Sequence, residues 1–303
     1  TGICGGDEQL SQYRVGRNNG VMGMQEVFSR IPMPTWGWLG VNDLPMPKHL
    51  GDTQRLSFSC AAGECKKHIV ELRESGVQEI CVEIADGAEM ALTFIQFVPT
   101  EQSAASRITA EVGRQGLFSC TIVEVGAAHT ASELHVNLAG DEARADVWGL
   151  YFGDADRKID LNYIIRQAGR HTDANLQVRG ALLDRSVKTF RGTLDFIEGA
   201  RGSSGKEDEE VTILSPHARN RSVPLMLSHE GDVDGHHAVS IGKIDADKLF
   251  YLMSRGLNER DAQKLIVEAS FEPVLSRIGS ETLRTEIGAY LEGRLSGGSQ
   301  QEF

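Results

Sequence analysis

A period of two in the apolar residues is the feature of this sequence that most constrains its fold. It starts near residue 80, where Ile80, Val82 and Ile84 alternate with polar or smaller residues. Because successive side chains of a strand point to opposite faces, this period predicts strands with one buried face. The alternation recurs as far as residue 241, with these apolar members: Met90, Leu92, Phe94, Leu134, Val136, Leu138, Ile159, Leu161, Tyr163, Ile165, Leu176, Val178, Leu194, Phe196, Val211, Ile213, Val239 and Ile241.

No segment with a helical period separates these strands. A βαβ architecture needs a helix between its strands and is therefore excluded, which leaves a sandwich, a barrel or a β-solenoid. The 33 glycines and an aromatic content of only 6% fit many tight turns between short strands. Asp86-Gly87 is typical of a hairpin turn. Small turn residues favour the solenoid, although no strict repeat is visible.

Three segments ahead of the last strands depart from this pattern. Residues 1–50 are rich in proline, and we expect an extended lead-in that Trp36 and Trp38 anchor on the main domain. Residues 61–75 have apolar residues at helical spacing, which predicts a short helix that stops at Gly76. Residues 199–210 combine glycine and serine with an acidic run, which is typical of a solvated loop.

The helical period returns after Asp245, which is a suitable N-cap. Asn258 caps the next predicted helix, which Pro273 kinks or ends, and a third helix starts at Ser280. We therefore divide the chain into an extended lead-in (1–50), a β-rich core (51–243) and a helical domain (244–303).

The net charge of −12 opposes binding to nucleic acids and to anionic membranes, because both attract basic surfaces. No apolar run reaches the roughly 18 residues of a membrane span, and no signal peptide is visible, so we expect a cytoplasmic protein. All five cysteines lie within the first 120 residues. Their odd number and wide spacing fit a reduced compartment better than a disulfide framework.

Residues 228–244 concentrate side chains that bind metals. Imidazole and carboxylate groups together suit iron, manganese or zinc. On a strand, Asp232, Asp234 and His236 share one face and His237 takes the other, so only one of the adjacent histidines faces a given site. A polar turn without a function remains open. The phosphate loop, the serine nucleophile elbow and the His-Glu-x-x-His zinc motif are absent from the sequence.

Several stretches together form a more specific pattern. The first runs from Ser215 to Leu227, enters the histidine-rich segment and ends in Leu249-Phe-Tyr-Leu-Met-Ser-Arg-Gly-Leu257. The others are Gly149-Leu-Tyr-Phe-Gly-Asp154, Asp160, Thr189-Phe-Arg-Gly192 and Thr35-Trp-Gly-Trp-Leu-Gly-Val-Asn42. This pattern resembles the SufB/SufD family of iron–sulfur cluster assembly proteins, and it is closer to the SufD members or to a short single-subunit member.

The resemblance implies a mainly β fold, a right-handed parallel β-helix followed by a C-terminal α-helical domain. It also implies a scaffold rather than an enzyme. In this family SufB and SufD pair through their β-helices, and each binds the ATPase SufC through its C-terminal helices. ATP would then be hydrolysed only by the partner. The chain would form a homodimer, or a heterodimer with a SufB-like paralogue that carries cysteines.

The resemblance also places His237 at the family's interface histidine. SufD members often have a cysteine two residues earlier, where this chain has Gly235, and the position of an essential SufB cysteine is acidic here, near Glu209. A transient iron–sulfur cluster or iron would therefore need His237, carboxylates or a partner's cysteine, and a flavin is left open. The candidate ligands beside His237 are Asp234, Glu230, His236 and Glu209.

The C-terminal helices would dock the ATPase through an apolar and acidic face. The residues expected at that contact are Leu249, Phe250, Tyr251, Arg255, Leu257, Leu265 and Phe271. Two other functions remain open. One is a metal-binding β-helix module that uses His236 and His237. The other is a polysaccharide-acting β-helix enzyme with Asp232 and Asp234 as acid and base.

Overall fold

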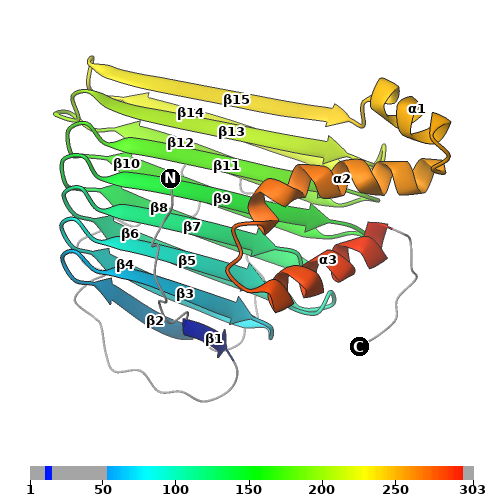
Figure 1. Ribbon diagram of the computed structural model, residues 1–303, viewed down its shortest axis with the longest axis horizontal. Helices are drawn as coiled ribbons and strands as arrows, with labels where there is room; N and C mark the ends of the chain where they lie inside the picture. Colours follow the sequence, from blue (N-terminus) through cyan, green and yellow to red (C-terminus); the bar gives the residue numbers. More distant parts are fainter. Residues whose placement is uncertain (1–10, 16–52, 296–303) are drawn as a thin grey trace.

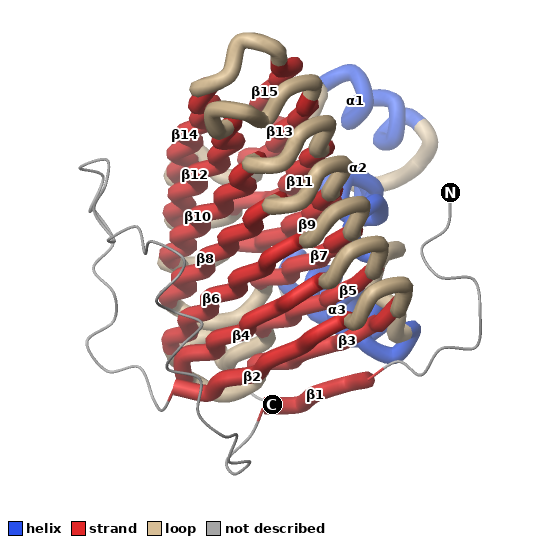
Figure 2. Tube along the Cα trace, turned by 90° about the vertical axis from the view of Figure 1, so that its left-hand side faces the viewer, coloured by secondary structure: helices blue, strands red, loops and turns tan. Residues whose placement is uncertain are grey.

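The computed structural model describes residues 11–15 and 53–295 and has the architecture of a parallel β-solenoid with two sheets (Figure 1). The odd-numbered strands form an eight-stranded sheet in the order β1-β3-β5-β7-β9-β11-β13-β15. The even-numbered strands form a seven-stranded sheet in the order β14-β12-β10-β8-β6-β4-β2. Each strand pairs in parallel with the strand two places along the chain, so the coils stack on one another (Figure 2). The predicted mainly β, parallel fold is confirmed.

Apart from the five-residue β1, the strands are 8 to 11 residues long. They are β1 (Ser11–Val15), β2 (Thr53–Cys60), β3 (Cys65–Leu72), β4 (Gly76–Ile84), β5 (Glu89–Gln96), β6 (Ser103–Val112), β7 (Leu117–Glu124), β8 (His129–Leu138), β9 (Arg144–Gly153), β10 (Lys158–Gln167), β11 (Asp173–Leu182), β12 (Val187–Phe196), β13 (Ser203–Ile213), β14 (Arg219–Ser228) and β15 (Val233–Lys243). Of the predicted lead-in (1–50), the structure describes only residues 11–15. These residues form β1, which pairs with β3. Trp36 and Trp38 lie outside the described residues.

Three helices follow the last strand, as the return of the helical period predicts. They are α1 (Ala246–Ser254), α2 (Glu259–Leu275) and α3 (Glu281–Leu295). Asp245 caps α1 and Asn258 caps α2 through their side-chain oxygens, and Pro273 lies inside the last turn of α2. None of these helices is long and apolar enough to cross a membrane.

The chain passes from one sheet to the other through corners that stack about 29 residues apart. The corner residues Gly87, Gln115, Glu142 and His171 all have positive φ. The N–H of Gln115 donates to the carbonyl of Asp141 (2.9 Å), and the N–H of Glu142 donates to that of Arg170 (2.7 Å). The Asp86-Gly87 turn is one of these corners rather than a hairpin, because β4 and β5 belong to different sheets.

The predicted helix at 61–75 is wrong, because β3 occupies most of that segment. Val70 and Leu72 face the interior, whereas Ile69 faces outward and packs with the C-terminal helices. Burial on both faces makes the strand nearly all apolar at one end, and this removes the alternation that identifies a strand. The expectation of reduced thiols is wrong for Cys65, which is disulfide-bonded, whereas the other described cysteines, Cys60, Cys81 and Cys120, are free.

The loop predicted at 199–210 is also wrong beyond its first residues, because β13 begins at Ser203. Gly205, Glu207, Glu209 and Val211 alternate along one face of this strand and are buried. The acidic run is therefore a strand in which alternate carboxylates face the interior.

Two apolar cores hold the molecule together. The larger fills the space between the two sheets and includes Phe94, Tyr151, Tyr163 and Phe190. The smaller lies between α2–α3 and the outer face of the eight-stranded sheet, which the helices cross in Figure 1. The members of this second core are Ile69, Ile95, Val123, Val125, Leu150, Phe152, Ala181, Val267, Phe271, Val274, Ile278, Leu283, Ile287 and Leu291.

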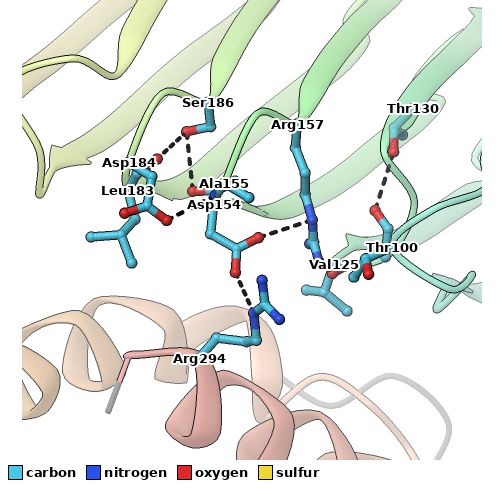
Figure 3. A network of polar contacts seen from close by, with 12 residues as sticks. Thr100, Val125, Thr130, Asp154, Ala155, Arg157, Leu183, Asp184, Ser186 and Arg294 are labelled. Atoms are coloured by element: carbon cyan, nitrogen blue, oxygen red, sulfur yellow. Dashed lines mark hydrogen bonds and ion pairs between the residues drawn. The ribbon is translucent and has the colours of Figure 1, made fainter. Parts of the chain in front are cut away.

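Buried ion pairs fix α3 against the solenoid (Figure 3). The carboxylate of Asp154, which follows β9, pairs with Arg157 (2.9 Å) and with Arg294 of α3. Arg157 also donates to the carbonyl of Val125 (2.6 Å) and to the hydroxyl of Tyr290 in α3. A second link joins Arg73, beyond β3, to Glu286 of α3 (2.6 Å). Together with the second core, these contacts join α2 and α3 to the β-solenoid.

We predict that Asp154→Asn weakens this joint by about 3 kcal/mol, because it leaves two arginines without their carboxylate in a buried setting. Urea unfolding measures the loss, and hydrogen exchange across residues 281–295 locates it. The control is Asp156→Asn, which removes an exposed pair with Arg185 and should cost less than about 1 kcal/mol. Equal losses in the two variants would contradict the assignment.

A further carboxyl group, that of Glu124 at the end of β7, lies in the interior and is 2% exposed. Burial raises its pKa to about 8, and the nearby hydroxyls of Ser132 and Ser106 offset only part of that shift. The folded-state pKa is above the unfolded value, so the folded chain binds this proton more tightly. Its contribution to stability is therefore full at low pH and is lost as pH rises toward 8.

We predict that Glu124→Gln removes this pH dependence and stabilises the folded protein at pH 8.5 by at most about 5 kcal/mol relative to the unchanged chain. At pH 4 the two proteins should differ little. Urea unfolding at both pH values measures the difference, with exposed Glu101→Gln as the control. A stability difference that does not change between the two pH values would count against a neutral Glu124.

Candidate functional site

The solenoid has an open end, where β14 and β15 carry no further coil among the described residues. Inward-facing residues of β15 are identified by their register on β13, where Gly205↔Gly235, Glu207↔His237 and Glu209↔Val239 are paired. His237 therefore belongs to the interior row of the last strand. It is nevertheless exposed, because no other strand of the described residues covers that row.

The structure separates the residues that the sequence placed together around His237. Asp234 and His236 lie on the outer face of β15, with His236 Nε2 3.1 Å from Asp234 Oδ1. Glu230 lies in the turn before β15, where backbone N–H groups of Asp232, Gly231 and Gly199 donate to its carboxylate and lower its pKa. The opposite faces of His236 and His237 are as expected. The expected ligand set of His237, Asp234 and Glu230 is not brought together.

Glu209, which stands near the family's cysteine position, is fully buried between the sheets. It forms an ion pair with Lys188 of β12, and the hydroxyl of Tyr151 donates to its Oε1 (3.4 Å). Lys188 Nζ also donates to the hydroxyl of Ser222 on β14 (3.2 Å). Burial lowers the pKa of Lys188 to about 8 although the carboxylate opposes this shift. Glu209, a candidate ligand of the cluster or iron site, is therefore the ion-pair partner of Lys188 and is closed to solvent in this structure.

Sequence reasoning missed Glu207, which lies directly below His237 and is 1% exposed. Burial and the neighbouring Glu209 raise the pKa of Glu207 to about 7. Neither of its carboxylate oxygens has a hydrogen-bond partner. The signal that could have found it is the alternation of Gly205, Glu207, Glu209 and Val211, which places two carboxylates on the buried face of a strand.

Several residues of the pattern at 149–192 have structural roles in the solenoid. Asp154 anchors α3, as described above, and Asp160 pairs with Arg191 across β10 and β12. A Cβ atom at Gly192 would overlap the carboxylate of Glu207, so only glycine leaves room for that group. In the last coil, a Cβ at Gly235 would likewise overlap the sulfur of Met226.

A second candidate site is the surface of α1 and the start of α2. None of the residues of α1 is buried, and Phe250 is 74% exposed. We call the exposed apolar residues Phe250, Tyr251, Met253 and Leu265 the α1 surface. The guanidinium of Arg255 lies over the ring of Tyr251, with 5.2 Å between Cζ and the ring centroid.

The other expected docking residues divide into two groups. Leu249 and Leu257 are partly buried. Phe271 is fully buried in the core between α2 and the sheet. Its predicted contact with a partner is therefore wrong: the apolar stripe of α2 packs on the solenoid, and the sequence alone could not separate that face from a docking face. Met253 was missed.

Within residues 53–295, no group of three or more His, Cys, Asp or Glu residues lies close enough to hold a metal ion. The three free thiols, Cys60, Cys81 and Cys120, are all buried. Burial raises the pKa of Cys120, so this thiol stays protonated. The open end of one chain thus supplies an imidazole and carboxylates, and any further ligand must come from outside this part of the chain.

Residues 61–270 match the family model described as "SUF system FeS cluster assembly, SufBD core domain". The chain is 26% identical to the iron–sulfur cluster assembly protein SufD of Bacillus subtilis over 183 residues, which are 60% of this chain and 42% of that protein. It is 31% identical to an iron–sulfur cluster assembly SufBD family protein of Pyrococcus horikoshii over 216 residues, 70% of this chain and 47% of that protein. A Mycobacterium tuberculosis protein of the same description is 25% identical over 237 residues, 75% of this chain and 60% of its own length. The chain spans about half the length of the curated relatives it matches.

The Lys188–Glu209 pair allows a direct test of the buried charges. We predict that Lys188→Met destabilises the protein by about 3–5 kcal/mol, because it leaves the buried carboxyl group of Glu209 without its ion-pair partner. Lys188→Met combined with Glu209→Leu should recover most of that loss. Urea unfolding measures both variants, with Lys206→Met on the outer face of β13 as the control. A double variant as unstable as the single one would show that the pair is not the cause.

Proposed function

Since the chain belongs to the SufBD family of iron–sulfur cluster assembly proteins, we propose that it is a scaffold subunit of a SUF-type assembly complex in the cytoplasm. It positions partners and has no catalytic group of its own. A SufC-like ATPase supplies ATP hydrolysis. The observation that carries this proposal is the α1 surface, because all of its residues except Leu265 lie in the stretch 249–257 that resembles the family most closely.

The α1 surface is suited to dock the ATPase. A nine-residue helix with no buried residue gains little stability from its own fold. The exposure of Phe250 and Tyr251 therefore has a cost in water unless a partner covers the rings. Asp247 and Asp261 add acidic groups near this surface, which favours a partner groove with basic residues at its rim.

The open end is suited to pair with a second solenoid. Among the described residues, β14 and β15 are the last members of their sheets, and an edge strand can pair with a strand of another chain through its backbone groups. The partner is a second copy of this chain or a SufB-like paralogue. Pairing about the middle of β15 brings His237 close to the junction, because His237 lies next to the midpoint of Val233–Lys243. Iron or a nascent cluster would be the cargo held there.

Two variants separate the two contacts. We predict that Phe250→Asp lowers the affinity for a co-expressed SufC-like ATPase at least about tenfold, since it places a charge at the centre of an apolar contact. Ile241→Asp, at a 50% exposed position of β15, should instead reduce pairing between solenoids and leave ATPase binding intact. Affinity purification and analytical ultracentrifugation measure the two effects.

The docking assignment fails if Phe250→Asp retains the ATPase with unchanged affinity. The scaffold proposal as a whole fails if the unchanged chain retains no ATPase and its complex accepts neither iron nor sulfide under anaerobic reconstitution. Thermal unfolding of each variant checks that the solenoid is intact. Deletion of 245–303 is not a suitable substitute, because α2 and α3 cover an apolar face of the sheet.

A further inference from the structure

A cluster of buried hydroxyl groups lies in the interior of the solenoid, several coils below the open end. Ser106 of β6 and Ser132 of β8 are in register on the seven-stranded sheet, and the hydroxyl of Ser106 donates to that of Ser132 (3.1 Å). The hydroxyl of Tyr163, on β10, lies 3.5 Å from that of Ser132. Three adjacent strands of one sheet thus direct oxygen atoms into the same part of the interior.

The eight-stranded sheet contributes a carboxyl group to this cluster. Glu124, at the end of β7, is 2% exposed, and neither of its carboxylate oxygens has a hydrogen-bond partner. The hydroxyls of Ser106 and Ser132 are close enough to act on its pKa, but burial outweighs them and raises it. On the coil below Ser106, the fully buried Gln78 also has an Oε1 atom without a donor. Buried acceptors without donors are costly, so these oxygens point to a positively charged group.

The neighbours of Glu124 along its own column do not supply that group. The residue in register on β5 is Gln96, whose amide nitrogen donates to the hydroxyl of Thr130 (3.5 Å). The residue in register on β9 is Tyr151, whose hydroxyl donates to Glu209 (3.4 Å). Both side-chain donors of the column are therefore directed to other acceptors.

Glu124 is also the group that decides the charge of the cluster. Burial raises the pKa values of Cys120, Tyr151 and Tyr163, so these three groups stay neutral. Lys188, an ammonium group on β12, pairs with Glu209. When Glu124 is ionised, the cluster carries a single negative charge, and one positive charge balances it.

From this arrangement we infer that Glu124 and the hydroxyl oxygens of Ser106, Ser132 and Tyr163 bind one Na⁺ ion in the interior of the solenoid. Carboxylate and neutral oxygens are the ligands that hard cations prefer. A hydroxyl oxygen can accept a cation because its lone pairs are available and its hydrogen rotates away. A divalent ion would leave an excess charge in an apolar interior, which is costly.

The spacing of the oxygens fits an ion of this size. Ca²⁺, which is nearly as large as Na⁺, lies about 2.3–2.6 Å from its ligands, so two oxygens at right angles around such an ion are about 3.3–3.7 Å apart. The two spacings in the hydroxyl row are 3.1 and 3.5 Å. The larger K⁺ needs a wider arrangement. Na⁺ and a proton compete for Glu124, since either of them makes the cluster neutral, and the site therefore fills as pH rises.

Thermal unfolding of the full chain tests the site, with NaCl compared with choline chloride at equal ionic strength. At pH 8.5, we expect Tm to rise by about 2 °C for each tenfold increase of Na⁺ above its Kd, because Na⁺ binds the folded chain alone. Choline, which is too large for the interior, should have no such effect. At pH 5 the proton occupies Glu124, and the two salts should give the same Tm.

Two variants assign the effect to this cluster. Glu124→Gln should abolish the difference between the salts, so Na⁺ should narrow the stability gain predicted above for this variant at pH 8.5. Ser132→Ala keeps the carboxylate and removes one neutral ligand, and it should require at least about tenfold more Na⁺ for the same rise in Tm. The exposed Glu101→Gln is the control and should keep the full response to Na⁺.

A Tm that is equal in Na⁺ and choline at pH 8.5 overturns the inference, since the cluster then holds water or a proton only. A response that survives in Glu124→Gln overturns it as well, because Na⁺ then acts at another place. An equal response to K⁺ contradicts the assignment to an ion of the size of Na⁺. Should Glu124→Gln fail to fold, Ser132→Ala alone carries the test. None of these measurements involves an ATPase or a second solenoid, so their outcome is independent of the proposed function.

Discussion

Register between successive coils is the constraint on which the rest of this structure depends. Each residue of a parallel strand stacks on one particular residue of the coil below, so the interior is a set of columns rather than a single mixed core. The ring of Tyr151 occupies the space that a side chain at Gly180 would need in the next coil. Likewise, the carboxylate of Glu207 occupies the space that a side chain at Gly192, on the facing sheet, would need. In each column, this register therefore determines which interior positions can hold a large or a charged side chain.

The ends of those columns are where function can be built. In the middle of the solenoid every interior side chain has a neighbour above and below, and aliphatic residues fill the space well. Within the part of the chain that the structure describes, β15 has no coil above it, so His237 is exposed while it still belongs to the interior row. Beneath His237, the buried side chains of Lys188, Glu207 and Glu209 lie between this open end and the aliphatic core. The helices are divided in a different way. α2 and α3 cover a sheet, whereas α1 extends beyond it (Figure 1) and has no buried residue.

Much of the fold could be predicted from the period of two, which located most strands between residues 80 and 241. That period cannot show whether strands are parallel. The parallel arrangement was predicted only from the family resemblance. It fails at β3 because Ile69 and Val70 are buried on opposite faces, and at β13 because carboxylates occupy interior positions. For the site, the sequence separated His236 from His237. It could not pair Lys188 with Glu209, since that contact joins two sheets and depends on the fold.

The stacked corners make one whole coil the unit in which this chain can change its length. Corner residues such as Gln115, Glu142 and His171 have the same left-handed conformation, and each is bonded to the corner of the next coil. Gain or loss of a single residue between two corners would move every side chain of a strand to the opposite face. Removal of an entire coil would instead join equivalent corners and preserve both sheets. Evolution or design can therefore lengthen or shorten the β-solenoid by whole coils. The surfaces at its two ends, and what they bind, stay the same.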